Sequence, residues 1–116
     1  MNLAKKRMLG IQRRKDAYKA RLQIKERLLA GETPYTRKDG AVVLPGMVHG
    51  VPAWMLAALA DGTLAQREVP NPETAGGEQL IKSQGGSWAV ARHGIAYALS
   101  AAECADRGLK AGPAND

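Results

Sequence analysis

The chain has 116 residues, of which 45% are hydrophobic and 24% charged, with a formal net charge of +6. This length allows one domain with a modest core, and no apolar run approaches the roughly 18 residues needed to cross a bilayer. Cys104 is the only cysteine, which excludes an intramolecular disulfide. We therefore expect a cytoplasmic protein.

The positive charge is concentrated at the N-terminus. Residues 1–30 contain ten basic and two acidic side chains, whereas the remaining 86 residues carry a net charge of −2. This asymmetry predicts either a polyanionic partner or docking of the basic segment on the acidic body. The candidate polyanion-binding residues are Lys5, Lys6, Arg7, Arg13, Arg14, Lys19, Arg21 and Arg27.

Residues 1–31 are predicted to form a basic amphipathic helix. A stripe with alternating spacings of four and three runs through it, typical of heptad positions a and d. The stripe comprises Ala4, Met8, Ile11, Lys15, Tyr18, Leu22, Lys25 and Leu29. We expect this seam to rest on the protein's own body or on a neighbouring copy, with interface residues Met8, Ile11, Tyr18, Leu22 and Leu29. Gly31 and Pro34 are natural stop signals for the helix.

Residues 32–116 are predicted to form a compact body that begins with a β-hairpin and a helix. Asp39-Gly40 is a favoured two-residue turn between strands at 35–38 and 41–44. The apolar stretch at 52–61 predicts a helix that is buried on most sides and ends at Asp61-Gly62. The Gly- and Pro-rich stretch at 66–86 predicts a long loop.

A second hairpin and helix complete the predicted body. Strands at 87–92 and 95–99 flank His93-Gly94, and Ser100 with Glu103 has the pattern of a capping box that opens a short helix closed by Gly108. The expected fold is therefore α+β: a long basic helix followed by two hairpin–helix units, whose strands form one small antiparallel sheet with helices on one face.

Base-specific recognition of nucleic acid is not indicated. The sequence lacks helix-turn-helix spacing, zinc-finger patterns and aromatic ribonucleoprotein motifs. Tyr18 is the one aromatic residue in the basic segment, whereas single-strand binding uses several aromatic stacking platforms. We therefore expect non-specific contacts with phosphates if the partner is a nucleic acid, and otherwise contact with an acidic protein surface.

Catalytic and metal-binding signatures are missing from the sequence. His49, His93 and Cys104 are the soft metal-ligand candidates, but none stands in a paired spacing, and a structural zinc site needs four ligands. The glycines at 75–77 and 84–86 do not fit the phosphate-loop pattern, and the acidic residues are scattered singly. We expect no metal, no cofactor and no enzymatic activity.

The length, the Ala- and Gly-rich body and the charged leading helix together resemble, at the level of a class, small accessory proteins of bacteriophages of GC-rich hosts. No family motif allows functional residues to be carried over. The resemblance implies a viral protein in the host cytoplasm or the virion.

The expected function is that of a non-enzymatic binding protein whose basic helix docks on a negatively charged partner. The alternatives are a structural component of a capsid, head–tail or tail assembly, and an inhibitor of a host defence complex such as an anti-CRISPR. No membrane contact is expected, whereas a homo-oligomer or larger assembly is compatible with the seam.

Overall fold

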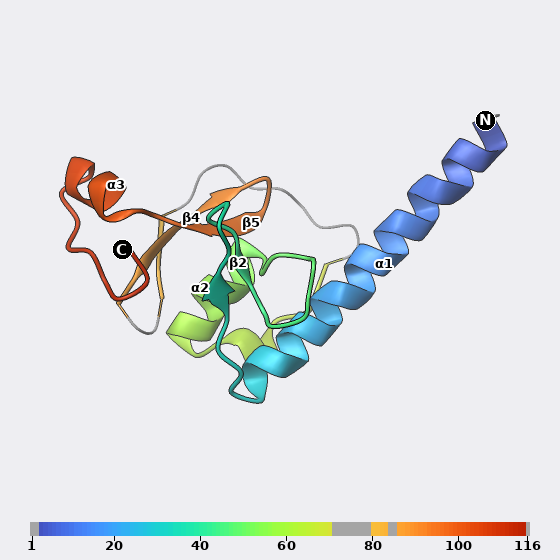
Figure 1. Ribbon diagram of the computed structural model, residues 1–116. Coiled ribbons are helices and arrows are strands. Elements are labelled where there is room, and N and C mark those ends of the chain that lie inside the picture. Colours follow the sequence, from blue (N-terminus) through green and yellow to red (C-terminus); the bar gives the residue numbers. More distant parts are fainter. Residues whose placement is uncertain (1–2, 71–79, 84–85, 116) are drawn as a thin grey trace.

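The computed structural model describes residues 3–70, 80–83 and 86–115, with side chains described from Lys15 onward. The elements in chain order are α1 (Leu3–Leu29), β1 (Tyr35–Thr36), β2 (Val42–Val43), α2 (Ala53–Asp61), the 3-10 turn η1 (Leu64–Gln66), β3 (Leu80–Lys82), β4 (Trp88–Arg92), β5 (Ile95–Ala98) and α3 (Ala101–Asp106). This arrangement confirms the α+β class (Figure 1).

The long N-terminal helix ends where the sequence predicts. Gly31 has a φ of 94°, the left-handed conformation that glycine adopts at low cost. The amide of Glu32 donates to the carbonyl of Arg27 at 3.0 Å, which caps the last turn. Pro34 follows and cannot continue the helix.

The first hairpin has a longer loop than the predicted two-residue turn. Thr36 pairs with Val42, and the amide of Arg37 donates to the carbonyl of Ala41 at 2.8 Å. The loop therefore contains three residues, Lys38 to Gly40, with Gly40 at a φ of 92°. A three-residue loop with glycine in the left-handed region is a common hairpin connection, and the Asp39 carboxylate supports it by accepting from the amide of Ala41 at 3.0 Å.

The strands form two small antiparallel sheets, one of β1 and β2 and one in the order β3-β4-β5, instead of the single sheet expected. The returning chain occupies the second edge of β2, because Gly50 bridges Val43 and the amide of Val51 donates to the carbonyl of Val42 at 2.7 Å. A bridge between Ala41 and Tyr97 connects the first hairpin to β5.

Part of the predicted loop at 66–86 is a strand. Ile81 is buried and pairs with Ala89, so β3 adds an edge strand to the second hairpin. The apolar pair Leu80-Ile81 was the sequence signal for this strand, but three residues are too few for a periodicity to be recognised. Residues 71–79 and 84–85 of the predicted loop lie outside the described residues.

The second hairpin and the last helix are confirmed. Arg92 pairs with Ile95 across a two-residue turn, and His93 and Gly94 have φ values of 52° and 80°, as the favoured tight hairpin turn requires. The Ser100 hydroxyl accepts from the amide of Glu103, and the Glu103 carboxylate accepts from the amide of Ser100, both at 3.1 Å.

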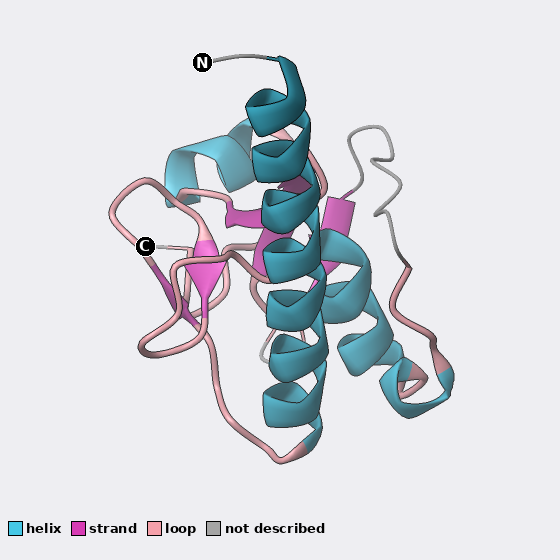
Figure 2. Cartoon of the chain, turned by 90° about the vertical axis from the view of Figure 1, so that its right-hand side faces the viewer, coloured by secondary structure: helices cyan, strands magenta, loops and turns pink. Residues whose placement is uncertain are grey.

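Helices cover both faces of the three-stranded sheet, whereas one face was expected. Successive strand residues point to opposite faces: Ala89 belongs to the main core with α2, and Val90 packs with Cys104 of α3. The helix α2 contacts both α1 and the sheet, and its Met55 and Leu56 are buried in the main core. Figure 2 shows α1 lying across the side of this body, close to α2.

Candidate partner-binding face of helix α1

The helix α1 packs on the body through a stripe with a spacing of four residues. Ala20, Ile24 and Leu28 are all buried, and Ile24 and Leu28 belong to the main core. Residues four apart lie one above the other on a helix. This stripe therefore forms the inward face of α1, and the second half of the helix is part of the core.

Two leucines of the predicted seam point the other way. Leu22 is 39% exposed and Leu29 is 47% exposed, and two residues of separation place Leu22 about 200° around the helix from the buried Ile24. The expectation that these two leucines rest on the protein's own body is therefore wrong. The physical reason lies in Lys15, which shares the seam and is exposed: burying the whole stripe would have desolvated its ammonium group.

Tyr18 lies between the two faces. Its side chain is half-buried, and the Arg21 guanidinium stands 5.8 Å from the centre of its ring, within the range of a cation–π contact. The other two predicted seam residues, Met8 and Ile11, lie outside the part of the chain whose side chains the structure describes.

Arg21 and Lys25, two cations in the second half of α1, bind groups of the protein itself. Arg21 is only 8% exposed, and its Nη2 donates to the carbonyl of Pro70 at 3.0 Å. The Lys25 ammonium donates to the carbonyl of Arg67. The predicted role of Arg21 in polyanion binding is therefore corrected, because its buried guanidinium ties α1 to the segment after η1.

Arg27, another predicted polyanion-binding residue, forms a bidentate ion pair with Glu32. Nε and Nη2 of Arg27 donate to the two carboxylate oxygens at 2.8 and 2.6 Å, and Nη2 also donates to the carbonyl of Pro45 at 2.9 Å. The hydrogen bond from Arg27 lowers the pKa of Glu32 below its ordinary value. Arg27 therefore holds the chain after α1 in place, and its charge is neutralised locally.

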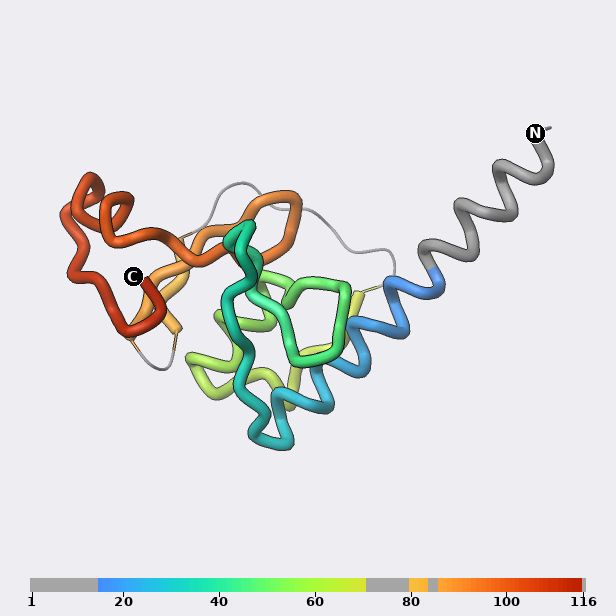
Figure 3. Tube along the Cα trace, viewed as in Figure 1, coloured from blue at the N-terminus to red at the C-terminus, as the bar shows by residue number. Residues whose placement is uncertain are grey.

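The exposed cations of α1 lie earlier in the helix. Lys15 and Lys19 are both exposed, and Figure 3 shows this described part of α1 leading into the body. Residues 1–19 contain seven basic side chains and one acidic side chain. Five of these, Lys5, Lys6, Arg7, Arg13 and Arg14, are candidate polyanion-binding residues whose side chains lie outside the described part.

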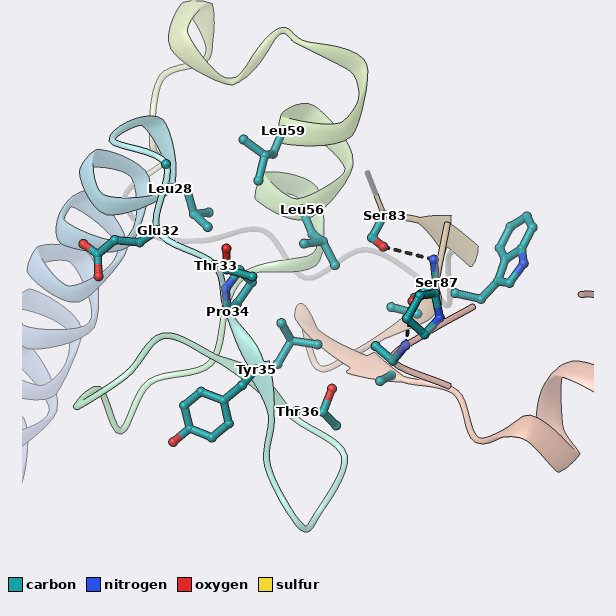
Figure 4. Close-up of a pocket in the computed structure, with 17 residues that line it drawn as sticks. Leu28, Glu32, Thr33, Pro34, Tyr35, Thr36, Leu56, Leu59, Ser83 and Ser87 are labelled. Atoms are coloured by element: carbon teal, nitrogen blue, oxygen red, sulfur yellow. Dashed lines mark hydrogen bonds between the residues drawn. The ribbon is translucent and has the colours of Figure 1, made fainter. Parts of the chain in front are cut away.

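A groove of about 400 Å³ opens beside the end of α1 and is a second candidate site. Leu28, Leu56 and Leu59 line its helical side, and Ser83 and Ser87 lie across from them (Figure 4). The amide of Ser87 donates to Ser83 Oγ at 3.2 Å, and Ser87 Oγ accepts from the amide of Ala114 at 2.9 Å. The two serines thus stabilise the groove wall, and the groove presents mainly apolar surface.

Pro113 and Ala114 of the groove wall belong to a C-terminal clamp, residues 112–115, that the sequence did not reveal. The side chain of Asn115 is buried and accepts from the amide of Trp88 at 2.8 Å while donating to the carbonyls of Trp88 and Leu99 at 2.8 and 2.7 Å. The carboxamide thus pairs with β4 much as a neighbouring strand would. A Cβ at Gly112 would lie 2.5 Å from the carbonyl oxygen of Gly86, so only glycine allows this approach.

The predicted absence of metal chemistry concerns three residues. In the part of the chain that the structure describes, His49 and His93 are exposed and Cys104 is buried. No group of three or more potential ligands of the types His, Cys, Asp and Glu comes together among the described residues. Within the same residues, no helix has both the length and the apolar character required to cross a membrane.

Comparison with protein-family models, curated proteins and solved structures yields no match for this chain.

Proposed function

We propose that this protein is a non-enzymatic binding protein that docks on a negatively charged partner through the basic helix α1. The observation that carries the proposal is the division of the cations along the helix. Arg21, Lys25 and Arg27 bind groups of the protein itself, whereas Lys15 and Lys19 are exposed. The site is therefore assigned to residues 1–19, and Arg21 and Arg27 are removed from it.

The charge of the two parts of the chain supports this assignment. Residues 1–30 have a net charge of +8, and the rest has a net charge of −2. Two acidic residues of the body, Glu32 and Asp39, form ion pairs with nearby arginines, Arg27 and Arg37. A concentrated positive charge of this kind attracts polyanions over distances up to about a Debye length, roughly 10 Å at moderate salt.

The experiment compares two variants that each lose two positive charges. Lys15→Gln/Lys19→Gln removes exposed cations from α1, and Lys38→Gln/Lys110→Gln removes exposed cations from the body. Binding of a short DNA duplex and of poly-glutamate is measured by fluorescence anisotropy over a range of salt concentrations. The body variant keeps the protein's net charge equal to that of the helix variant, so it controls for total charge.

We expect the helix variant alone to lose affinity. If about five phosphates are engaged, log K for the duplex should fall with log salt at a slope of about −4 to −5, and the helix variant should flatten the slope by about two. Equal losses in the two variants would mean that the attraction depends on total charge, and would contradict the assignment to α1. Failure of both polyanions to bind at low salt would contradict the proposed function itself.

A further inference from the structure

We infer that the outward face of α1 binds an acidic amphipathic helix of a protein partner. The inference rests on the proposed function and narrows the class of partner. Leu22 and Leu29, the exposed part of the seam, are one heptad apart, and both are among the large exposed hydrophobic residues. Leucines at this spacing on an exposed helix face are typical of a surface that pairs with another helix.

The part of the helix that leads to the seam is strongly positive, with seven basic side chains and one acidic side chain in residues 1–19. Lys15 continues the line of Leu22 and Leu29 one heptad earlier, and the flanking e positions carry one charge of each sign, Lys19 and Glu26; all three side chains are exposed. Charges at flanking positions select the partner in helix pairing, because opposite charges attract across the seam and like charges repel. A partner helix with leucines on its seam and glutamates opposite Lys15 and Lys19 would complement both the leucines and the basic part of α1.

A second copy of this chain fits the seam less well. Pairing two α1 helices would bring together two copies of residues 1–19, each with a net charge of +6 from seven basic side chains and one acidic side chain, and in a parallel pair Lys15 would lie beside its own equivalent in the seam. Like charges at such positions oppose association. Self-association would therefore work against the leucine contacts, whereas an acidic helix would add to them.

A nucleic-acid backbone also leaves part of this surface unused. Phosphates would engage Lys15 and Lys19, but a highly charged and hydrated backbone offers no apolar surface for Leu22 and Leu29. The free energy of removing these side chains from water is gained only if the partner is apolar at the same place. The combination of an apolar line with cations beside it thus favours a protein helix over a duplex.

The test uses two synthetic peptides of about three heptads each. One has leucine at positions a and d and glutamate at e and g, and the other has the same composition in scrambled order. Their affinities are measured for the whole protein and for two variants. Leu22→Gln/Leu29→Gln removes the seam while keeping the charge and good helix propensity, and Val48→Gln/Leu80→Gln removes two other exposed apolar side chains as a control.

We expect the unaltered protein to bind the amphipathic peptide at least about tenfold more tightly than the scrambled one. The seam variant should lose this preference and keep its affinity for a DNA duplex, and the control variant should behave as the unaltered protein. Circular dichroism verifies that each variant retains its helix content. Equal binding of both peptides by the unaltered protein would overturn the inference even if a variant failed to fold.

Other results would also overturn the inference while leaving the proposed function intact. If the seam variant kept its preference for the amphipathic peptide but Lys15→Gln/Lys19→Gln still weakened polyanion binding, charge alone would explain docking. If sedimentation equilibrium showed a dimer that became a monomer in the seam variant, the seam would belong to a second copy. If the seam variant lost duplex and peptide affinity together, the leucines would not distinguish a protein partner.

Discussion

The inward and outward faces of α1 carry the same kinds of side chain but differ in their surroundings. Inward, Ile24 lies in the main core, and Arg21 donates to the carbonyl of Pro70. Outward, Leu22 and Lys19 are exposed. Aliphatic and cationic residues thus stabilise the protein on one face and are available to a partner on the other. Residue type alone does not distinguish these roles, because the tertiary contacts of each face decide them.

The largest expected difference between the faces is in the free energy of unfolding after truncation of an aliphatic side chain. Ile24 is fully buried, so Ile24→Ala should lower the free energy of unfolding by about 2–5 kcal/mol through lost transfer energy and a cavity. Leu22→Ala, on the exposed face, should change it by no more than about 0.5 kcal/mol. Denaturation with urea measures both, and equal losses would mean that the two faces are not distinct.

The next largest difference concerns the cations. Arg21→Met keeps much of the aliphatic stem but removes the buried donor to the carbonyl of Pro70. Because a hydrogen bond of a charged group contributes about 1.5–3 kcal/mol, this substitution should lower the free energy of unfolding by about that amount. Lys19→Met should have an effect within about 0.5 kcal/mol, because Lys19 is exposed. The same urea denaturation compares them. If Arg21→Met left the free energy of unfolding unchanged, this contact would not hold α1 on the body.

A smaller effect is expected for the ion pair at the end of α1. The hydrogen bond from Arg27 lowers the pKa of Glu32 from its ordinary value of 4.5. A lowered carboxyl pKa stabilises the folded state fully at pH values above the unfolded pKa, and this contribution is lost as the pH falls through the folded pKa. Carbon-detected NMR should therefore place the titration of Glu32 below 4.5, and Arg27→Gln should move it upward.

One result for Arg27→Gln would contradict this prediction. If the titration midpoint of Glu32 were the same with and without the guanidinium, the ion pair would contribute nothing to the end of α1 in solution. The exposed location of both groups limits the pair's contribution to stability, so the pKa of Glu32 is a more sensitive observable than the free energy of unfolding.

Features set by neighbouring residues could be predicted from the sequence. The turn at His93-Gly94, the capping box of Ser100 and Glu103, and the end of α1 at Gly31 each depend on contacts within a few residues. Such local patterns have few alternative conformations. The α+β class follows from the order of these elements, and it could therefore be predicted as well.

Features set by distant contacts could not be predicted. Heptad counting finds the seam of α1, but the body packs on the Ala20, Ile24 and Leu28 stripe instead, a choice that depends on what α2 and η1 present. The role of Asn115 likewise depends on Trp88 of β4, which lies 27 residues earlier in the chain. An asparagine near a chain end has no local pattern that indicates such a role. The candidate site could therefore be predicted only as a helix, without its orientation.

Methyl NMR of the side chains on the two faces can show whether the outward face of α1 is the docking surface. On addition of the acidic amphipathic peptide, we expect shifts of the Leu22 and Leu29 methyl signals, because these side chains lie on the exposed face. The methyl signals of Ile24 and Leu28, which lie in the core, should stay in place. Shifts confined to Ile24 and Leu28, with Leu22 and Leu29 unchanged, would contradict the claim that the outward face of α1 is the docking surface.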